Sequence, residues 1–194
     1  MSGPAISSFE VPALDDLPAD LKERIEAVRA KTGFIPNVFL VMARRPDEFR
    51  AFFAYYDALL LRQGGLSKAE KEMIVVATSA ANQCPYCVVA HGALVRLFSK
   101  NPLLGDQVAV NYRQAEIAPR QRLMLEAALK LATAPQTFGE EDVQRLLAAG
   151  FSREDVWDIG AITALFALSN RLAHLSAMRP NDEFYTLGRG RSGP

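Results

Sequence analysis

The sequence has only two cysteines among its 194 residues, and they lie three positions apart, at Cys84 and Cys87. A secreted protein that is held together by disulfides spreads several cysteines along the chain to close long loops. A structural disulfide framework is therefore excluded, and both thiols belong to one local feature. With 49% hydrophobic residues, the chain is long enough to build a core without such cross-links.

The sequence also lacks an excess of charge of either sign, since it has 22 basic and 22 acidic side chains. It therefore has no net positive field of the kind that attracts nucleic acid or an anionic membrane. The longest apolar stretch, residues 159–168, falls short of the roughly 20 residues that cross a bilayer. The N-terminus has no basic segment followed by an apolar run, as a signal peptide would. We expect a cytoplasmic protein that binds small uncharged molecules or other proteins.

Alternating β-branched runs bounded by hairpin signals are missing as well, whereas helix start and stop signals recur along the whole chain. The fold class is therefore predicted to be all-α. We expect one domain over residues 15–187 with about eight to nine helices. The flanking residues 1–14 and 188–194 have little to bury and are predicted to be a flexible segment and a disordered tail.

Prolines at first helical positions, glycines after last ones and serine–acidic capping boxes set the predicted helix boundaries. Residues 34–37 are interpreted as a loop. The last helix is apolar on every side, which indicates a core position or a subunit interface. The predicted helices are one ending at Gly33, one from Pro46 to Gly64, one from Ser67 to Asn82, one beginning at Pro85, one over 104–112, one from Pro119 to Pro135, one over 141–148, and one from Ser152 to about Met178.

The two cysteines stand at the predicted start of a helix. Pro85 suits the first helical position, because the N–H that it lacks would have no partner there, and this places Cys84 at or near the N-cap. Cys87 then falls inside the first turn. Two sulfurs at this spacing can form a disulfide, and the exposed N–H groups of a helix N-terminus stabilise a thiolate. The pair is therefore predicted to be redox-active.

Two further residues can manage protons at this pair. His91 lies four residues after Cys87, on the same helical face, where its imidazole can take the thiol proton or stabilise the thiolate. Glu72 lies on the preceding predicted helix, and an antiparallel helix pair would bring its carboxylate over the His91 face. A carboxylate beside a histidine fixes its tautomer. The predicted catalytic residues are thus Cys87, Cys84, His91 and Glu72.

Other interpretations of these residues stay open. A closed zinc site would need four ligands, and Cys84, Cys87 and His91 would have to be joined by the distant His174. The two cysteines could also be buried and inert. His174 itself fits better as a hydrogen-bonded packing or interface residue than as a catalyst. We predict no metal and no cofactor.

The same residues carry a resemblance to a known family. Glu72, eleven residues, Cys84-Pro85-Tyr86-Cys87, three residues and His91 match the core motif of the alkylhydroperoxidase D (AhpD) family, part of the carboxymuconolactone decarboxylase-like superfamily. Residues 35–46, 66–91, 170–172 and 179–182 resemble its uncharacterised peroxidase-related subgroup. The resemblance extends from about residue 15 to residue 187.

The resemblance implies an all-α, usually oligomeric protein in which the second cysteine attacks a peroxide and the first resolves the product. Cys87 would become a sulfenic acid, Cys84 would condense with it, and an external thiol or dithiol donor would reduce the disulfide. Glu72 and His91 would relay protons. The best-studied branch of the family has a histidine just before the second cysteine, where this chain has Tyr86. From the residues alone the two roles stay open, because in thioredoxin-like proteins the first cysteine attacks.

We therefore expect a homo-oligomeric, thiol-dependent peroxidase of antioxidant defence that reduces hydrogen peroxide or small organic hydroperoxides. Decarboxylase members of the superfamily lack the cysteine pair, which points away from lactone decarboxylation. Two alternatives are a thiol-disulfide oxidoreductase or redox sensor without peroxide turnover, and a non-catalytic helical assembly protein with a vestigial site. Aromatic residues at helical spacing form either core or interface, or line an apolar route for organic hydroperoxides: Phe49, Phe52, Phe53, Tyr55 and Tyr56.

Overall fold

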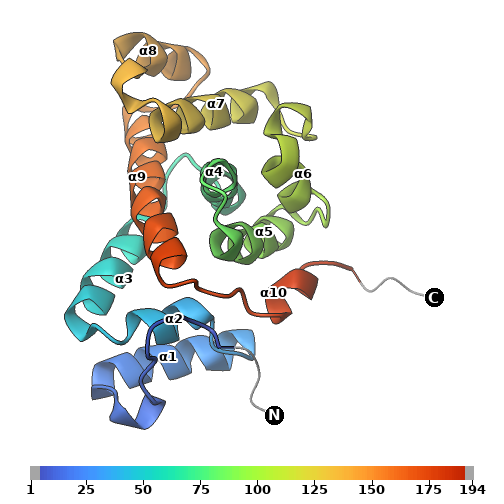
Figure 1. Cartoon of the computed structure of the whole chain (residues 1–194). Helices are drawn as coiled ribbons and strands as arrows, with labels where there is room; N and C mark the ends of the chain where they lie inside the picture. Colours follow the sequence, from blue (N-terminus) through green and yellow to red (C-terminus); the bar gives the residue numbers. More distant parts are fainter. Residues whose placement is uncertain (1–4, 191–194) are drawn as a thin grey trace.

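The computed structural model describes residues 5–190 (Figure 1), which form ten α-helices, three short 3-10 helices and no strand. The all-α class is confirmed, and the count exceeds the expected eight to nine because α2 and α10 are short helices that the sequence did not reveal. The α-helices are α1 (Ala19–Thr32), α2 (Asn37–Met42), α3 (Pro46–Leu60), α4 (Lys68–Ala81), α5 (Pro85–Ser99), α6 (Leu104–Asn111), α7 (Pro119–Thr133), α8 (Glu140–Ala148), α9 (Arg153–Leu175) and α10 (Glu183–Thr186).

The predicted boundary signals act as expected. Gly33 ends α1 in the left-handed conformation with φ 86°, which glycine adopts without steric cost. The Ser67 hydroxyl accepts the N–H of Glu70 at 3.2 Å, while the Glu70 carboxylate accepts the N–H of Ser67 at 2.8 Å. This capping box opens α4, and Ser152 and Asp155 open α9 in the same way.

Helix α4 forms the centre of the fold. Figure 1 shows it nearly end-on, inside a ring made by α5, α6, α7 and α9, while α1, α2 and α3 lie to one side. Most of α4 is accordingly buried, including Met73, Ile74, Val75 and Val76 at 0% exposure. A helix enclosed on this many sides can place a polar side chain far from water.

Three consecutive charged residues fix the position of α4. Glu70, Lys71 and Glu72 are 6%, 1% and 4% exposed, and an unpaired charge at such depth is strongly destabilising. Each side chain has a partner on a different neighbour, so together they set the rotation and height of α4. Glu70 accepts a hydrogen bond from Arg120 of α7 at 2.7 Å. Lys71 donates to the carbonyl of Leu59, at the end of α3, and to the carbonyl of Arg62, just beyond it, at 2.7 Å each. Glu72 is bonded to His91 of α5 at 2.6 Å.

The predicted loop at 34–37 is corrected at its last residue, because Asn37 begins α2. Distant hydrogen bonds stabilise this start: the N–H of Asn37 donates to the Asn181 side chain, and the Asn37 amide donates to the carbonyl of Arg179, both at 2.7 Å. The partners are about 140 residues away in sequence, so no local pattern predicts the helix.

Helix α10 is also attached through contacts between distant parts of the chain. The carbonyls of Phe184 and Leu187, at α10, accept hydrogen bonds from the buried Arg96 of α5.

Hydrogen bonds anchor part of the segments predicted to be flexible. The N–H of Ser8 donates to Ser176 at 2.7 Å, and the N–H of Arg179 donates to Ile6 at 3.0 Å. At the other end, the Arg189 side chain bonds Asp106. Residues 1–4 and 191–194 lie outside the described residues, and the flexibility of the two segments stays a prediction.

Helix α9 buries one side and exposes another. Ile159, Ile162 and Phe166 are at most 2% exposed, whereas Trp157 and Leu168 are 70% and 51% exposed. The subunit interface predicted for this helix therefore stays a prediction. In the part of the chain that the structure describes, no helix is both long and apolar enough to cross a bilayer.

The contact between α5 and α6 gives a test of the fold. A Cβ atom added to Gly105 of α6 would lie 2.6 Å from the carbonyl oxygen of Gly92 of α5, whereas one added to Gly160 of α9 would meet only Leu131, at 3.5 Å. We expect Gly105→Ala to lower the free energy of unfolding by about 1–3 kcal/mol, because the rigid backbone of α5 has to move. Gly160→Ala, the control, should be neutral or stabilising by up to about 1 kcal/mol. Chemical denaturation measures both, and equal effects would contradict the close approach.

Candidate active site

The cysteine pair lies at the N-terminus of α5, as predicted. Cys84 is the N-cap residue, Pro85 is the first helical residue and Cys87 lies in the first turn. The N–H of Cys84 donates to the carbonyl of Ser79 at 2.9 Å, which attaches the start of α5 to the end of α4. Both cysteines are free thiols and each residue is 1% exposed. The two sulfurs are therefore internal and next to the positive end of a helix.

Glu72 and His91 meet as the antiparallel arrangement of α4 and α5 predicts. The Glu72 carboxylate lies 2.6 Å from Nδ1 of His91, and the two residues are 4% and 9% exposed. A carboxylate accepts hydrogen bonds, so Nδ1 carries the proton and Nε2 is the basic nitrogen of the neutral ring. Nε2 has no hydrogen-bond partner among residues 5–190, and the ring packs edge-on against Phe166 at 4.7 Å. His91 is thus oriented with one nitrogen available to a reacting group.

The two thiols differ in their pKa values. A hydrogen bond from Cys87 lowers the pKa of Cys84 to about 6, against the opposing effect of burial, and the backbone N–H groups of Cys87 and Tyr86 lower it further. The hydrogen bond to Cys84, together with burial, raises the pKa of Cys87 above its ordinary value. Cys84 therefore holds the negative charge at neutral pH, and Cys87 is the thiol that donates to it.

Helix α9 contributes polar residues that the sequence did not single out as functional. Ser169 Oγ lies 3.7 Å from Cys87 Sγ. Asn170 donates to Ser79 Oγ at 2.9 Å and accepts from the side chain of Asn82 at 2.9 Å. The signal for them is two adjacent polar residues directly after the apolar stretch 159–168 of a long helix, since buried polar side chains need partners. This network joins the ends of α4 and α9 beside the start of α5.

His174 also lies at this junction. Its Nε2 is 3.0 Å from the backbone carbonyl of Asn82, two residues before Cys84, and the residue is exposed. It is hydrogen-bonded, as the sequence predicts, and its role in packing or at an interface stays a prediction. Its charge is one of the causes that lower the pKa of Cys84.

The zinc interpretation lacks its ligand set. Over residues 5–190, no group of three or more His, Cys, Asp or Glu side chains is placed to hold a metal ion. His91 is engaged with Glu72, and His174 is engaged with a backbone carbonyl. In the structure, both imidazoles therefore make hydrogen bonds to other groups.

Two tyrosines complete the surroundings. Tyr86, which stands where the best-studied branch of the family has a histidine, accepts the N–H of Val38 at 3.0 Å, and burial raises its pKa. Burial and the nearby charge of Glu72 raise the pKa of Tyr56. Both rings are therefore neutral phenols, and Tyr86 serves to join α5 to α2.

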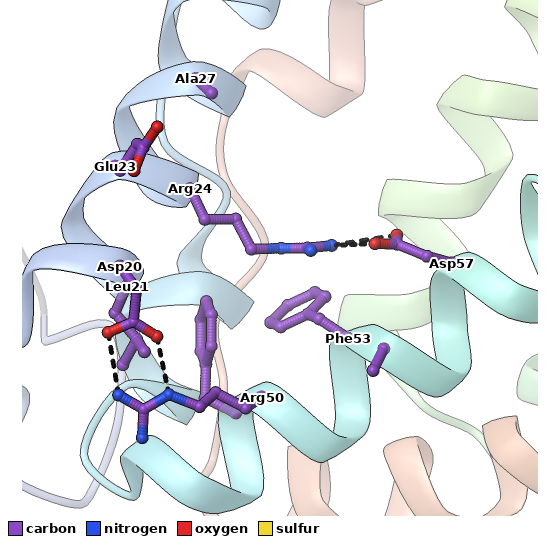
Figure 2. Close-up of a pocket in the computed structure, with 10 residues that line it drawn as sticks. Asp20, Leu21, Glu23, Arg24, Ala27, Arg50, Phe53 and Asp57 are labelled. Atoms are coloured by element: carbon purple, nitrogen blue, oxygen red, sulfur yellow. Dashed lines mark hydrogen bonds and ion pairs between the residues drawn. The ribbon is translucent and has the colours of Figure 1, made fainter.

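A cavity of about 520 Å³ lies between α1 and α3, away from the cysteines. Figure 2 shows Arg24 reaching from α1 to Asp57 of α3, with Phe53 beside it, and Arg50 bonded to Asp20. None of the four predicted catalytic residues lines this cavity. The use of the aromatic residues as a route for organic hydroperoxides thus stays a prediction.

The lowered pKa of Cys84 leads to a measurable titration. We expect reduced protein to show one thiolate with a midpoint near pH 6 when ultraviolet thiolate absorbance is followed against pH. Cys84→Ser should abolish this transition, and Cys87→Ser should weaken it without removing it, because the helix N–H groups remain. A single midpoint at the ordinary pKa of a cysteine in the wild type would show that the thiolate is not stabilised.

Comparison with known proteins identifies the family. The profile of the Carboxymuconolactone decarboxylase family matches residues 46–134, whereas no curated protein matches the chain. A structure from Ralstonia eutropha, described as an alkylhydroperoxidase AhpD core and uncharacterised peroxidase-related protein, is 60% identical, with a TM-score of 0.96 over 97% of this chain and 99% of its own. An uncharacterised peroxidase-related protein from Silicibacter is 39% identical, with a TM-score of 0.91 over 97% and 100%.

A more distant structure has the same fold. The debrominase Bmp8, in complex with 2,3,4-tribromopyrrole, is 18% identical and has a TM-score of 0.73 over 95% of this chain and 96% of its own. This likeness concerns the fold alone, and it shows that the fold serves more than one activity. From the two closer structures, the chain belongs to the AhpD-like, uncharacterised peroxidase-related group of the carboxymuconolactone decarboxylase-like superfamily, a group of enzymes.

Proposed function

We propose that this protein is a thiol-dependent peroxidase that reduces hydrogen peroxide or small organic hydroperoxides. The observation that carries the proposal is the cysteine pair at the N-terminus of α5, with the Glu72–His91 hydrogen bond of 2.6 Å in the same helix pair. A peroxidase needs a sulfur nucleophile, a second thiol to resolve the product and a group that moves protons. These groups come together here.

In the first step, the sulfur of Cys87 attacks one peroxide oxygen. The thiol proton of Cys87 passes to Nε2 of His91, which lies one helical turn further along α5 and is the available nitrogen of that ring. The O–O bond breaks, Cys87 becomes a sulfenic acid, and the departing alkoxide or hydroxide takes the proton from His91. The sulfur is oxidised by two electrons and the peroxide is reduced to an alcohol or water.

In the second step, the thiolate of Cys84 attacks the sulfenic sulfur of Cys87. The S–S bond forms, the S–O bond breaks, and the hydroxide that leaves takes a proton from solvent and departs as water. Two thiol groups of an external donor then reduce the disulfide by successive exchange and become a disulfide themselves. Glu72 holds His91 in the tautomer that both proton transfers require.

A second candidate function is thiol-disulfide exchange without peroxide turnover. It is favoured by the lowered pKa of Cys84, the N-cap cysteine, because the first cysteine of thioredoxin-like proteins is the attacking thiol. In that reaction Cys84 would attack the disulfide of a partner, and Cys87 would release the mixed disulfide. Reduction of a protein disulfide, faster than consumption of peroxide, would favour this candidate.

The setting that we propose is the cytoplasm, where thiols are kept reduced. The proposal is supported by two free cysteines at the site. We also propose a homo-oligomer, supported by the exposed apolar residues Trp157 and Leu168 on one side of α9. Sedimentation of the wild-type protein measures its subunit number.

Substitution of each cysteine tests the peroxidase assignment. Cys87→Ser should abolish the rapid reaction with hydrogen peroxide in stopped-flow measurements, because no attacking sulfur remains. Cys84→Ser should react once and accumulate a sulfenic acid on Cys87, detectable by mass spectrometry after trapping with dimedone. If Cys87→Ser still consumes peroxide and the trap labels Cys84, the two roles are exchanged. If neither cysteine of the wild type reacts faster than free cysteine, the peroxidase proposal is wrong.

Substitution of the acid–base pair tests the proton relay. We expect Glu72→Gln and His91→Gln each to slow the reaction of Cys87 with peroxide by about a hundredfold, the usual loss when a positioned acid or base is removed. The double variant should be no slower than His91→Gln alone, because Glu72 acts through the imidazole. A double variant in which the losses of the two single variants add up would contradict this coupling. Circular dichroism checks that each variant is folded.

A further inference from the structure

The chain has only two histidines: one follows the cysteine pair on α5, and the other, on α9, bonds the turn that precedes the pair. His91, on α5, is buried and bonded to Glu72, while His174, near the end of α9, is exposed and lies beside the turn that leads into Cys84. The scheme above uses only His91.

The turn before Cys84 determines where His174 lies. The imidazole Nε2 is 3.0 Å from the carbonyl of Asn82, and the Asn82 side chain donates to Asn170 at 2.9 Å, one turn before His174 on α9. Asn170 in turn donates to Ser79, whose carbonyl accepts the N–H of Cys84 at 2.9 Å. This closed set of hydrogen bonds holds His174 and Cys84 in a fixed relation.

We propose that His174 is a positioning residue that stabilises the thiolate of Cys84 for its attack on the oxidised Cys87. This inference rests on the proposed peroxidase scheme for the identity of the step. In that step Cys84 donates an electron pair to the sulfenic sulfur, the S–S bond forms, and hydroxide leaves with a proton as water. His174 keeps Cys84 in the thiolate form and is not itself consumed.

The chemistry of the first step explains why Cys84 needs a positive charge other than the thiol proton of Cys87. In the resting site, the thiol proton of Cys87 is the largest influence that keeps Cys84 ionised. That proton has left once Cys87 is a sulfenic acid. The stabilisation that remains comes from the helix N–H groups and from His174, whose charge also lowers the pKa of Cys84. The contribution of His174 therefore matters most when Cys84 has to attack.

A direct experiment measures Cys84 alone. In protein carrying Cys87→Ser, iodoacetamide alkylation of Cys84 is followed against pH by mass spectrometry, with and without changes at His174. His174→Gln keeps a donor for the Asn82 carbonyl but removes the charge, and His174→Lys keeps both. On the acidic side of the titration we expect His174→Gln to slow alkylation roughly five-fold, as the loss of one nearby charge would, and His174→Lys to restore it. Arg171→Gln, on the same helix, is the matched control and should change nothing.

The second measurement follows a single turnover with intact cysteines. His174→Gln should leave the peroxide step unchanged and slow disulfide formation by the same factor of roughly five, so that dimedone traps more sulfenic acid on Cys87. Equal alkylation rates in wild type, His174→Gln and His174→Lys would overturn the proposal, as would slowing by both substitutions, which indicates a purely structural role. If the wild type does not react with peroxide, the peroxidase scheme fails, while the alkylation result still decides whether His174 stabilises Cys84.

Discussion

The buried hydrogen bond between Glu72 and His91 is the interaction on which the arrangement of the site depends. A carboxylate that is 4% exposed, on a helix surrounded by other helices, needs a partner, or its burial would be strongly unfavourable. His91 is that partner, and the 2.6 Å contact fixes α5 against α4. The same requirement applies to the neighbouring Glu70 and Lys71, which bind other parts of the fold. Three adjacent charges thus hold the central helix in place, and one of them orients the imidazole of His91.

The start of α5 explains why the two cysteines differ although they are neighbours. Cys84, at the N-cap, receives backbone N–H groups and lies beside His174, so it is the sulfur that holds a charge at rest. Cys87 faces Ser169 and lies one turn from His91, so it is placed for a proton to be removed when a substrate arrives. A thiol of lowered pKa is present mostly as thiolate at neutral pH, but that thiolate is a weaker nucleophile. A sulfur of higher pKa is intrinsically more reactive once it is deprotonated. The division that we propose, with Cys87 attacking and Cys84 resolving, follows from this difference.

Local signals in the sequence were sufficient for most helices and for the position of the cysteine pair at the start of α5. The catalytic roles of the four predicted residues stay a prediction. Prolines, glycines and capping boxes act within a few residues, so Pro85 and Ser67 mark the starts of α5 and α4 correctly. Asn37 was assigned to a loop because its helix depends on Asn181, across the molecule. The role of α9 was missed for the same reason: Asn170 meets Ser79 and Asn82 only in the folded chain. What the sequence concealed was thus long-range polar contact, and this contact surrounds the cysteines.

The enclosure of the site limits what can react there. Both cysteines are 1% exposed, and the cavity of about 520 Å³ lies elsewhere, between α1 and α3. A substrate must therefore pass through the packed surroundings of the sulfurs, where local opening gives a small molecule an advantage over a bulky one. The exposed residues nearest in sequence to Cys84 are Gln83 and Pro85, and exposed His174 lies beside the same turn. A thiol donor that approaches from this side meets Cys84 before Cys87. Attack on the sulfur of Cys84 releases Cys87 as the thiol, which is the order that the proposed scheme requires for the next peroxide.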